Sequence, residues 1–125
     1  ALIDNNPWKR YWGLVVCTSF GEKAKTLVSQ IKKMANRDNE NLVRARAIEY
    51  LMLNQESFDA KIIEELLKNA KSDTEANLIL NSIGLIKNLN PHFKFNLSKE
   101  IFPLEWYDKP NDLINRRMNY LMNNR

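Results

Sequence analysis

Residues 38–51 read DNENLVRARAIEYL, an acidic turn followed by an apolar run with helical spacing. From Asp4, 34 residues earlier, the chain reads DNNPWKRYWGL, and again an arginine follows the aspartate by six residues. A third aspartate, Asp73, stands 35 residues after Asp38, with Ile79 in the place of the arginine. A period of this length built from two helices is typical of α-solenoids, in which each helix pair buries its apolar face against the next pair.

Helical periodicity dominates the first ninety residues. Asn6 before Pro7 predicts a helix start, and Gly21 predicts its end after about Phe20. Apolar residues then recur at spacings of three and four in four more segments, which are residues 24–35, 41–52, 62–70 and 73–89, the last with a Ser72-x-x-Glu75 capping box. The sequence therefore predicts an all-α fold in which five helices of about 12 to 15 residues pack antiparallel to their neighbours.

The character of the chain changes after Asn90. Three prolines interrupt a stretch rich in large apolar side chains, and a last helix is predicted from about Asn111. We expect this part to cover the end of the helical stack. The predicted organisation is one domain, with helical repeats over 1–90 and an irregular capping segment and C-terminal helix over 91–125.

Catalytic and metal-binding motifs are absent from the sequence. The single histidine, His92, has no Cys or His neighbour at metal-ligand spacing. Glu64 and Glu65 are adjacent on a helix and point in different directions, which makes them unsuitable as an acid/base pair. The lone Cys17 lies in an apolar run and is interpreted as a small buried hydrophobe. We therefore expect no catalytic, cofactor-binding or metal-binding residue in this chain.

Aromatic residues are the candidate interface positions. Trp8, Tyr11 and Trp12 share one helical face, and Trp106 and Tyr107 lie in the C-terminal apolar segment. Such faces can stack on sugars or nucleic-acid bases, but core or domain-interface packing is the commoner use of large aromatics. The second interpretation is the one we adopt for both groups.

The net charge of +4 is concentrated near the start of the chain, where six basic and two acidic residues precede Arg37. Lys23, Lys25, Lys32 and Lys33 account for most of the excess. An anionic partner such as nucleic acid or a sulfated glycan would suit this charge, but a solvated helix face explains it more simply. No apolar run is long enough to cross a bilayer, so we expect no membrane partner.

The repeat resembles the HEAT family. Its pattern Asp-x-x-x-x-Val-Arg-x-x-Ala-x-x-x-Leu is met at Asp38, Val43, Arg44, Ala47 and Leu51. In that family the aspartate and arginine commonly form a hydrogen-bonded ladder between adjacent units. The resemblance implies this structural role for Asp4, Arg10, Asp38 and Arg44, which Ile79 cannot continue. It also implies that the first helix is the second half of a repeat. The tetratricopeptide repeat has a similar period but needs a tryptophan in each unit.

A second resemblance is carried by residues 6–14, NPWKRYWGL. This segment is similar to an Asn-Pro-x-Val-Arg-Tyr-Trp-Ala/Gly-Leu segment in the helical tail that follows the catalytic domain of many bacterial sulfatases. Lys9 departs from that pattern, because an apolar residue precedes the arginine in those tails. Sulfatases use a formylglycine made within Cys/Ser-x-Pro-x-Arg and a calcium ion. Cys17 is followed by Thr18 and Ser19, so the chain lacks that motif, and both groups are expected only in a parent catalytic domain.

The resemblance implies a noncatalytic accessory domain that packs against the catalytic domain of its own parent chain. An anionic glycan near the interface and a periplasmic or secreted location are further expectations of the same kind. The alternative is an independent HEAT-like scaffold for protein–protein interaction, and a nucleic-acid-binding solenoid ranks below it.

Overall fold

The structure, a computed structural model, describes residues 2–59, 61–90, 98, 101–106 and 113–123. Among these residues there are helices and turns but no strands, so the predicted all-α class is confirmed. The chain divides into two compact units, Ala1–Ala60 and Lys61–Arg125, called here the first and second units. The division falls within the predicted repeat region of residues 1–90.

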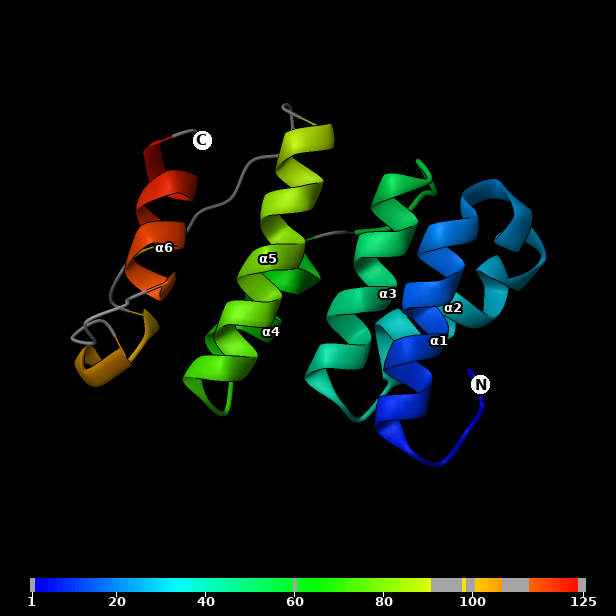
Figure 1. Cartoon of the computed structure of the whole chain (residues 1–125), viewed down its shortest axis with the longest axis horizontal. Helices are drawn as coiled ribbons and strands as arrows, with labels where there is room; N and C mark the ends of the chain where they lie inside the picture. The colour runs from blue at the N-terminus through cyan, green and yellow to red at the C-terminus, as the bar shows by residue number, and fades with distance from the viewer. Residues whose placement is uncertain (1, 60, 91–97, 99–100, 107–112, 124–125) are drawn as a thin grey trace. The chain divides into compact units, whose positions relative to one another are not determined.

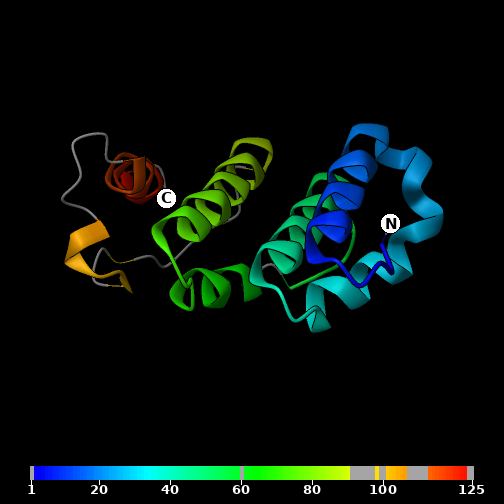
Figure 2. The ribbon, with the colours of Figure 1, turned by 60° about the horizontal axis from the view of Figure 1, so that its bottom comes forward.

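The first unit contains three α-helices and one 3₁₀ segment (Figure 1). These elements are α1 (Pro7–Phe20), η1 (Gly21–Leu27), α2 (Val28–Arg37) and α3 (Asn41–Leu53). Both α1 and α2 pack against α3, and Figures 1 and 2 show α1 and α3 side by side and running in the same direction.

The ends of α1 follow from local chemistry. The Asn6 side chain accepts a hydrogen bond of 2.9 Å from the amide of Trp8, and Pro7 occupies the first turn. At the other end Gly21 has a φ of 55°, a conformation that glycine adopts without the Cβ penalty of other residues. Both predicted boundaries of this helix are confirmed.

The second unit contains α4 (Ile62–Lys68), α5 (Asp73–Leu89), η3 (Leu104–Trp106) and α6 (Leu113–Asn123). Packing joins α5 to both α4 and α6. The hydroxyl of Ser72 accepts a 3.1 Å bond from the amide of Glu75, as the capping box predicts. The reciprocal bond is shifted by one residue, since Glu75 accepts from the amide of Lys71.

Three sequence-based expectations about the helices are wrong. Residues 21–27 form 3₁₀ turns and not the first part of a single helix over 24–35, because the chain must reverse direction within a few residues after Gly21. The helix α4 has seven residues, fewer than predicted. Leu27 and Leu89, assigned to apolar faces, are 40% and 68% exposed.

Two sets of residues that the repeat frame aligns lie in equivalent environments. Leu14, Ile48 and Ile83, which the 34- and 35-residue spacing aligns, are all fully buried. Ile31 and Leu66, aligned in the following helices, are also buried. The solenoid arrangement and the HEAT-like pairing of the helices stay predictions. His92, Tyr107 and the predicted start of the last helix near Asn111 lie outside the described residues.

Candidate functional site

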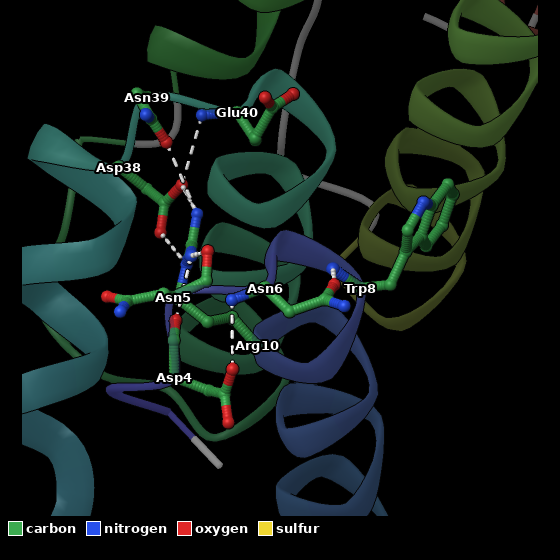
Figure 3. Close-up of polar contacts among 8 residues, drawn as sticks. All are labelled: Asp4, Asn5, Asn6, Trp8, Arg10, Asp38, Asn39 and Glu40. Carbon is green, nitrogen blue, oxygen red and sulfur yellow. Dashed lines mark hydrogen bonds and ion pairs between the residues drawn. The ribbon is translucent and has the colours of Figure 1, made fainter.

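The most developed polar site of the first unit is centred on Arg10 (Figure 3). Arg10 projects from the first turns of α1 toward Asp38, in the turn between α2 and α3. Its Nε lies 2.9 Å from Asp38 Oδ2 and its Nη2 3.0 Å from Asp38 Oδ1. This paired geometry matches the planar fork of the guanidinium to the carboxylate, which is the strongest arrangement of such a pair.

Every donor of the Arg10 guanidinium has an acceptor. Nη1 donates to the carbonyl oxygens of Asp4 at 2.8 Å and Asn5 at 3.1 Å, while Nη2 also donates to Asn39 Oδ1 at 3.2 Å. The Arg10 and Asp38 side chains are only 13% and 6% exposed. The hydrogen bond to Asp38 raises the pKa of Arg10, so the guanidinium stays charged. The site therefore ties the segment before α1 and the turn before α3 to one cation.

The four predicted ladder residues have different partners. Arg10 pairs with Asp38, one repeat later in the sequence, whereas Asp4 contributes its backbone carbonyl to Arg10 and its carboxylate to the amide of Asn6. Arg44 Nε donates to the carbonyl of Ala35 at 2.9 Å. The structure thus brings Asp4, Arg10 and Asp38 together. That these contacts make a HEAT ladder stays a prediction.

The predicted aromatic face of α1 is largely at the surface. Trp8 and Trp12 are 56% and 60% exposed, and Tyr11 lies between them and is half-buried. Edge-to-face contacts of 5.7 Å and 5.8 Å join Tyr11 to the two indoles. Of the two expected uses, core or domain-interface packing, the exposure of the tryptophans excludes the first, because their helix turns its buried face, with Leu14 and Cys17, the other way. Domain-interface packing stays a prediction.

A buried ion pair on α3 borders this aromatic cluster, and sequence reasoning did not single it out. Glu49 is fully buried, and its carboxylate lies 3.0 Å from Arg46 Nη1, a residue three positions earlier. The Arg46 guanidinium also lies over the ring of Tyr11, 5.8 Å from its centroid, in a cation–π contact. The i, i+3 spacing of opposite charges within an apolar run was the available signal.

The C-terminal aromatic group is described only in part. Trp106 is half-buried and its ring lies 5.3 Å from that of Phe102, which is buried. The other predicted member of the group, Tyr107, lies outside the described residues.

A second feature of the first unit is an apolar groove of about 470 Å³ beside α1. It is lined by Leu2, Ile3, Gly13, Val16, Cys17 and Leu27, with Gln30 as its one polar side chain. Cys17 is buried, as the sequence predicts, and burial raises the pKa of its thiol. A buried neutral thiol is a poor nucleophile, so this residue has a packing role.

Sites for metals and membranes were sought among the described residues. In that part of the chain, no three side chains of the His, Cys, Asp or Glu type gather closely enough to hold a metal ion. None of the described helices has both the length and the apolar character needed to span a membrane.

Comparison with known proteins finds no relative of this chain. No family model, curated protein or solved structure matches this chain. The HEAT-like and sulfatase-like interpretations therefore depend on the sequence patterns quoted above. The contacts of α1 are the observations on which a function can be argued.

Proposed function

We propose that this chain is a noncatalytic helical-repeat module that packs against another domain of a larger protein. The observation that carries the proposal is the exposure of Trp8 and Trp12 on α1, at 56% and 60%. Two exposed tryptophans held around one tyrosine form a rigid apolar surface. Tryptophan is enriched among the residues that dominate the energy of protein interfaces.

The composition of α1 supports the same proposal. Its 14 residues carry only two charged side chains, Lys9 and Arg10, and the site around Asp38 already occupies Arg10. A helix that is apolar on nearly all sides is one that other elements cover. Within the first unit, α1 is covered by α3 on one side, and its tryptophan face remains uncovered.

The anchoring of α1 would make this face effective for binding. Five hydrogen bonds from Arg10 fix the start of the helix that carries Trp8 and Trp12. A surface held in its bound geometry loses less conformational entropy on association than a mobile one. The function of the Arg10 site in this proposal is structural, since it orients the interface.

The partner in this proposal is the catalytic domain of a sulfatase-like hydrolase in the same parent protein. The support for it is the segment NPWKRYWGL at residues 6–14, which includes Trp8, Arg10 and Trp12. The same residues that resemble the sulfatase tail form the exposed face and its anchor. An anionic glycan substrate would then lie near the module, and its recognition would belong to the catalytic domain.

The first test is to extend the gene sequence upstream of the codon for Ala1. An open frame that encodes a domain with Cys/Ser-x-Pro-x-Arg supports the proposal. A nearby start codon, or a different upstream domain, overturns the sulfatase-like parent and leaves an independent interaction scaffold.

The second test measures packing directly, with the upstream domain and the 125-residue chain produced separately. The double variant Trp8→Ala/Trp12→Ala should weaken their binding at least about tenfold, as loss of interface tryptophans does. Leu104→Ala, a change at another highly exposed apolar residue, is the control and should leave the affinity unchanged. Equal binding by the double variant and the unchanged chain would refute the assigned interface.

A further inference from the structure

The apolar groove beside α1 adjoins the tryptophan face of that helix, since the lining residue Val16 follows Trp12 by four residues. Gly13, Val16, Cys17 and Phe20 are spaced i, i+3, i+4 and i+7, so they form one continuous stripe on α1. The first three line the groove, and Phe20 extends the stripe with 59% of its surface exposed. Leu27 of η1 also lines the groove.

We propose that this groove binds an amphipathic α-helix whose apolar face is bordered by aspartate or glutamate side chains. The inference adds a second surface to the proposed function and does not depend on it. The stripe from Gly13 to Phe20 extends for about 10 Å, two helical turns, at a rise of 1.5 Å per residue. That length suits the i, i+3, i+4, i+7 anchors by which helices fill grooves.

The openness of the groove favours a helix over a small apolar molecule. Small-ligand sites bury about 70–90% of the ligand surface. Here the lining residues Ile3, Val16 and Leu27 are themselves 82%, 52% and 40% exposed, so the groove covers an occupant from one side only. A helix can place one apolar face in such a groove and keep its polar face in water. Gly13 contributes no side chain, which allows the backbone of a partner to approach closely.

The charge around the groove determines the chemistry of the partner. Lys23 and Lys25 are exposed on η1, the segment that ends in the lining residue Leu27. Over residues 1–37 the sequence has seven basic residues and two acidic residues, Asp4 and Glu22. Carboxylates at the borders of the bound helix would meet this excess of positive charge, and lysines at the same positions would be repelled.

The test uses two synthetic amphipathic peptides of about 18 residues, long enough to form a helix in water. Both carry leucine at i, i+3, i+4 and i+7, and they differ only in having glutamate or lysine at the bordering positions. Binding to the 125-residue chain is measured by fluorescence anisotropy. The glutamate peptide should bind saturably and at least about tenfold more tightly than the lysine peptide.

Two variants test the groove and its charge. Val16→Glu, at a half-exposed position, should weaken binding of the glutamate peptide at least about tenfold. Lys23→Glu/Lys25→Glu should reverse the preference, so that the lysine peptide binds more tightly. Lys68→Glu/Lys71→Glu makes the same change in net charge in the second unit and should alter neither affinity. Circular dichroism checks that each variant keeps its helices.

Several results would overturn the inference. These are equal affinity for the two peptides, no saturable binding of either, or an unchanged preference in Lys23→Glu/Lys25→Glu. Dodecanoate provides the remaining comparison, because an aliphatic carboxylate could use the same groove and lysines. If dodecanoate binds, Val16→Glu abolishes its binding, and the peptides do not compete, the site is for a small lipid-like anion. Trp8→Ala, a change about two helical turns before Val16, should leave peptide binding intact, which separates this inference from the proposed interdomain packing.

Discussion

Replacing Arg10 with alanine removes a cation that five acceptors surround, and we expect the free energy of unfolding to fall. The variant leaves the Asp38 carboxylate, 6% exposed, without its two strongest donors. Only the amide of Glu40 still donates to it, at 3.0 Å. The carbonyl oxygens of Asp4 and Asn5 lose the Nη1 donor but can accept hydrogen bonds from water, because Asn5 is exposed and Asp4 is half-buried.

The magnitude follows from the burial of the pair. Removing one partner of a buried ion pair costs about 3–5 kcal/mol, because a charge is left buried without compensation. The Arg10 side chain is still 13% exposed, so water reaches the site and the cost should lie near the lower limit, about 3 kcal/mol. Arg10→Lys keeps the charge but loses the planar fork, and we expect it to cost about 2 kcal/mol.

The assay is urea unfolding followed by circular dichroism and by the fluorescence of Trp8 and Trp12, which lie in the same unit. A double-mutant cycle with Arg10→Ala and Asp38→Ala should give a coupling energy of about 1.5–3 kcal/mol. The matched control is Lys9→Ala. Lys9 also has an acidic partner, Asp4, but at 3.9 Å and with its side chain 67% exposed, so its loss should be within experimental error. Additive effects of the Arg10 and Asp38 changes would refute the reasoning.

Three further predictions concern other buried polar groups. Tyr50→Phe removes the 3.0 Å bond from its hydroxyl to the carbonyl of Gly21 and should lower the free energy of unfolding by about 1 kcal/mol, measured by urea titration. Lys87→Met keeps most of the buried aliphatic side chain but loses the 3.2 Å hydrogen bond to the carbonyl of Leu121. The free energy that protects the α6 amides from hydrogen exchange should therefore fall by about 1 kcal/mol, measured by amide hydrogen exchange. Burial raises the pKa of Cys17 and of Tyr50, so the folded chain holds both protons more tightly than the unfolded chain. The contribution of these two groups to stability should therefore be constant below about pH 8.5 and fall as the pH rises further. Cys17→Ala should remove the part of the fall below about pH 10, while any loss above it remains.

The parts of the fold that the sequence predicts correctly are those fixed by local chemistry. Asn6 and Pro7 define the start of α1 because capping needs only the residues of one turn, and Ser72 does the same for α5. The 3₁₀ form of residues 21–27 was not predictable in this way. The spacing of Ala24 and Leu27 fits an α-helix, and only the reversal of the chain after α1 selects the tighter turn.

The sequence predicted which residues form the candidate site, but not which contacts each of them makes. The repeat singled out Arg10 and Asp38 before any contact was known, because both recur at a fixed period. It could not show that Arg10 uses the carbonyl, and not the carboxylate, of Asp4, since that depends on the path of the chain before α1. The exposure of Trp8 and Trp12 was also beyond the sequence, because an aromatic face of a helix looks the same whether a neighbour covers it or not.

A comparison of α1 with α2 shows why the first of these helices needs a partner. In α2 the buried residues Ile31, Met34 and Ala35 form one stripe, and polar and charged residues fill most of the remaining surface. Such a helix buries its apolar side chains when a neighbour covers one side of it. In α1 the buried residues also occupy one side, but the remaining surface carries large exposed apolar side chains, which are Trp8, Trp12, Val16 and Phe20. Because Val16 follows Trp12 by four residues, the tryptophan face and the groove stripe adjoin each other on α1. Variants at Trp8 and at Val16, about two turns apart, are therefore the ones that test the two proposed contacts separately.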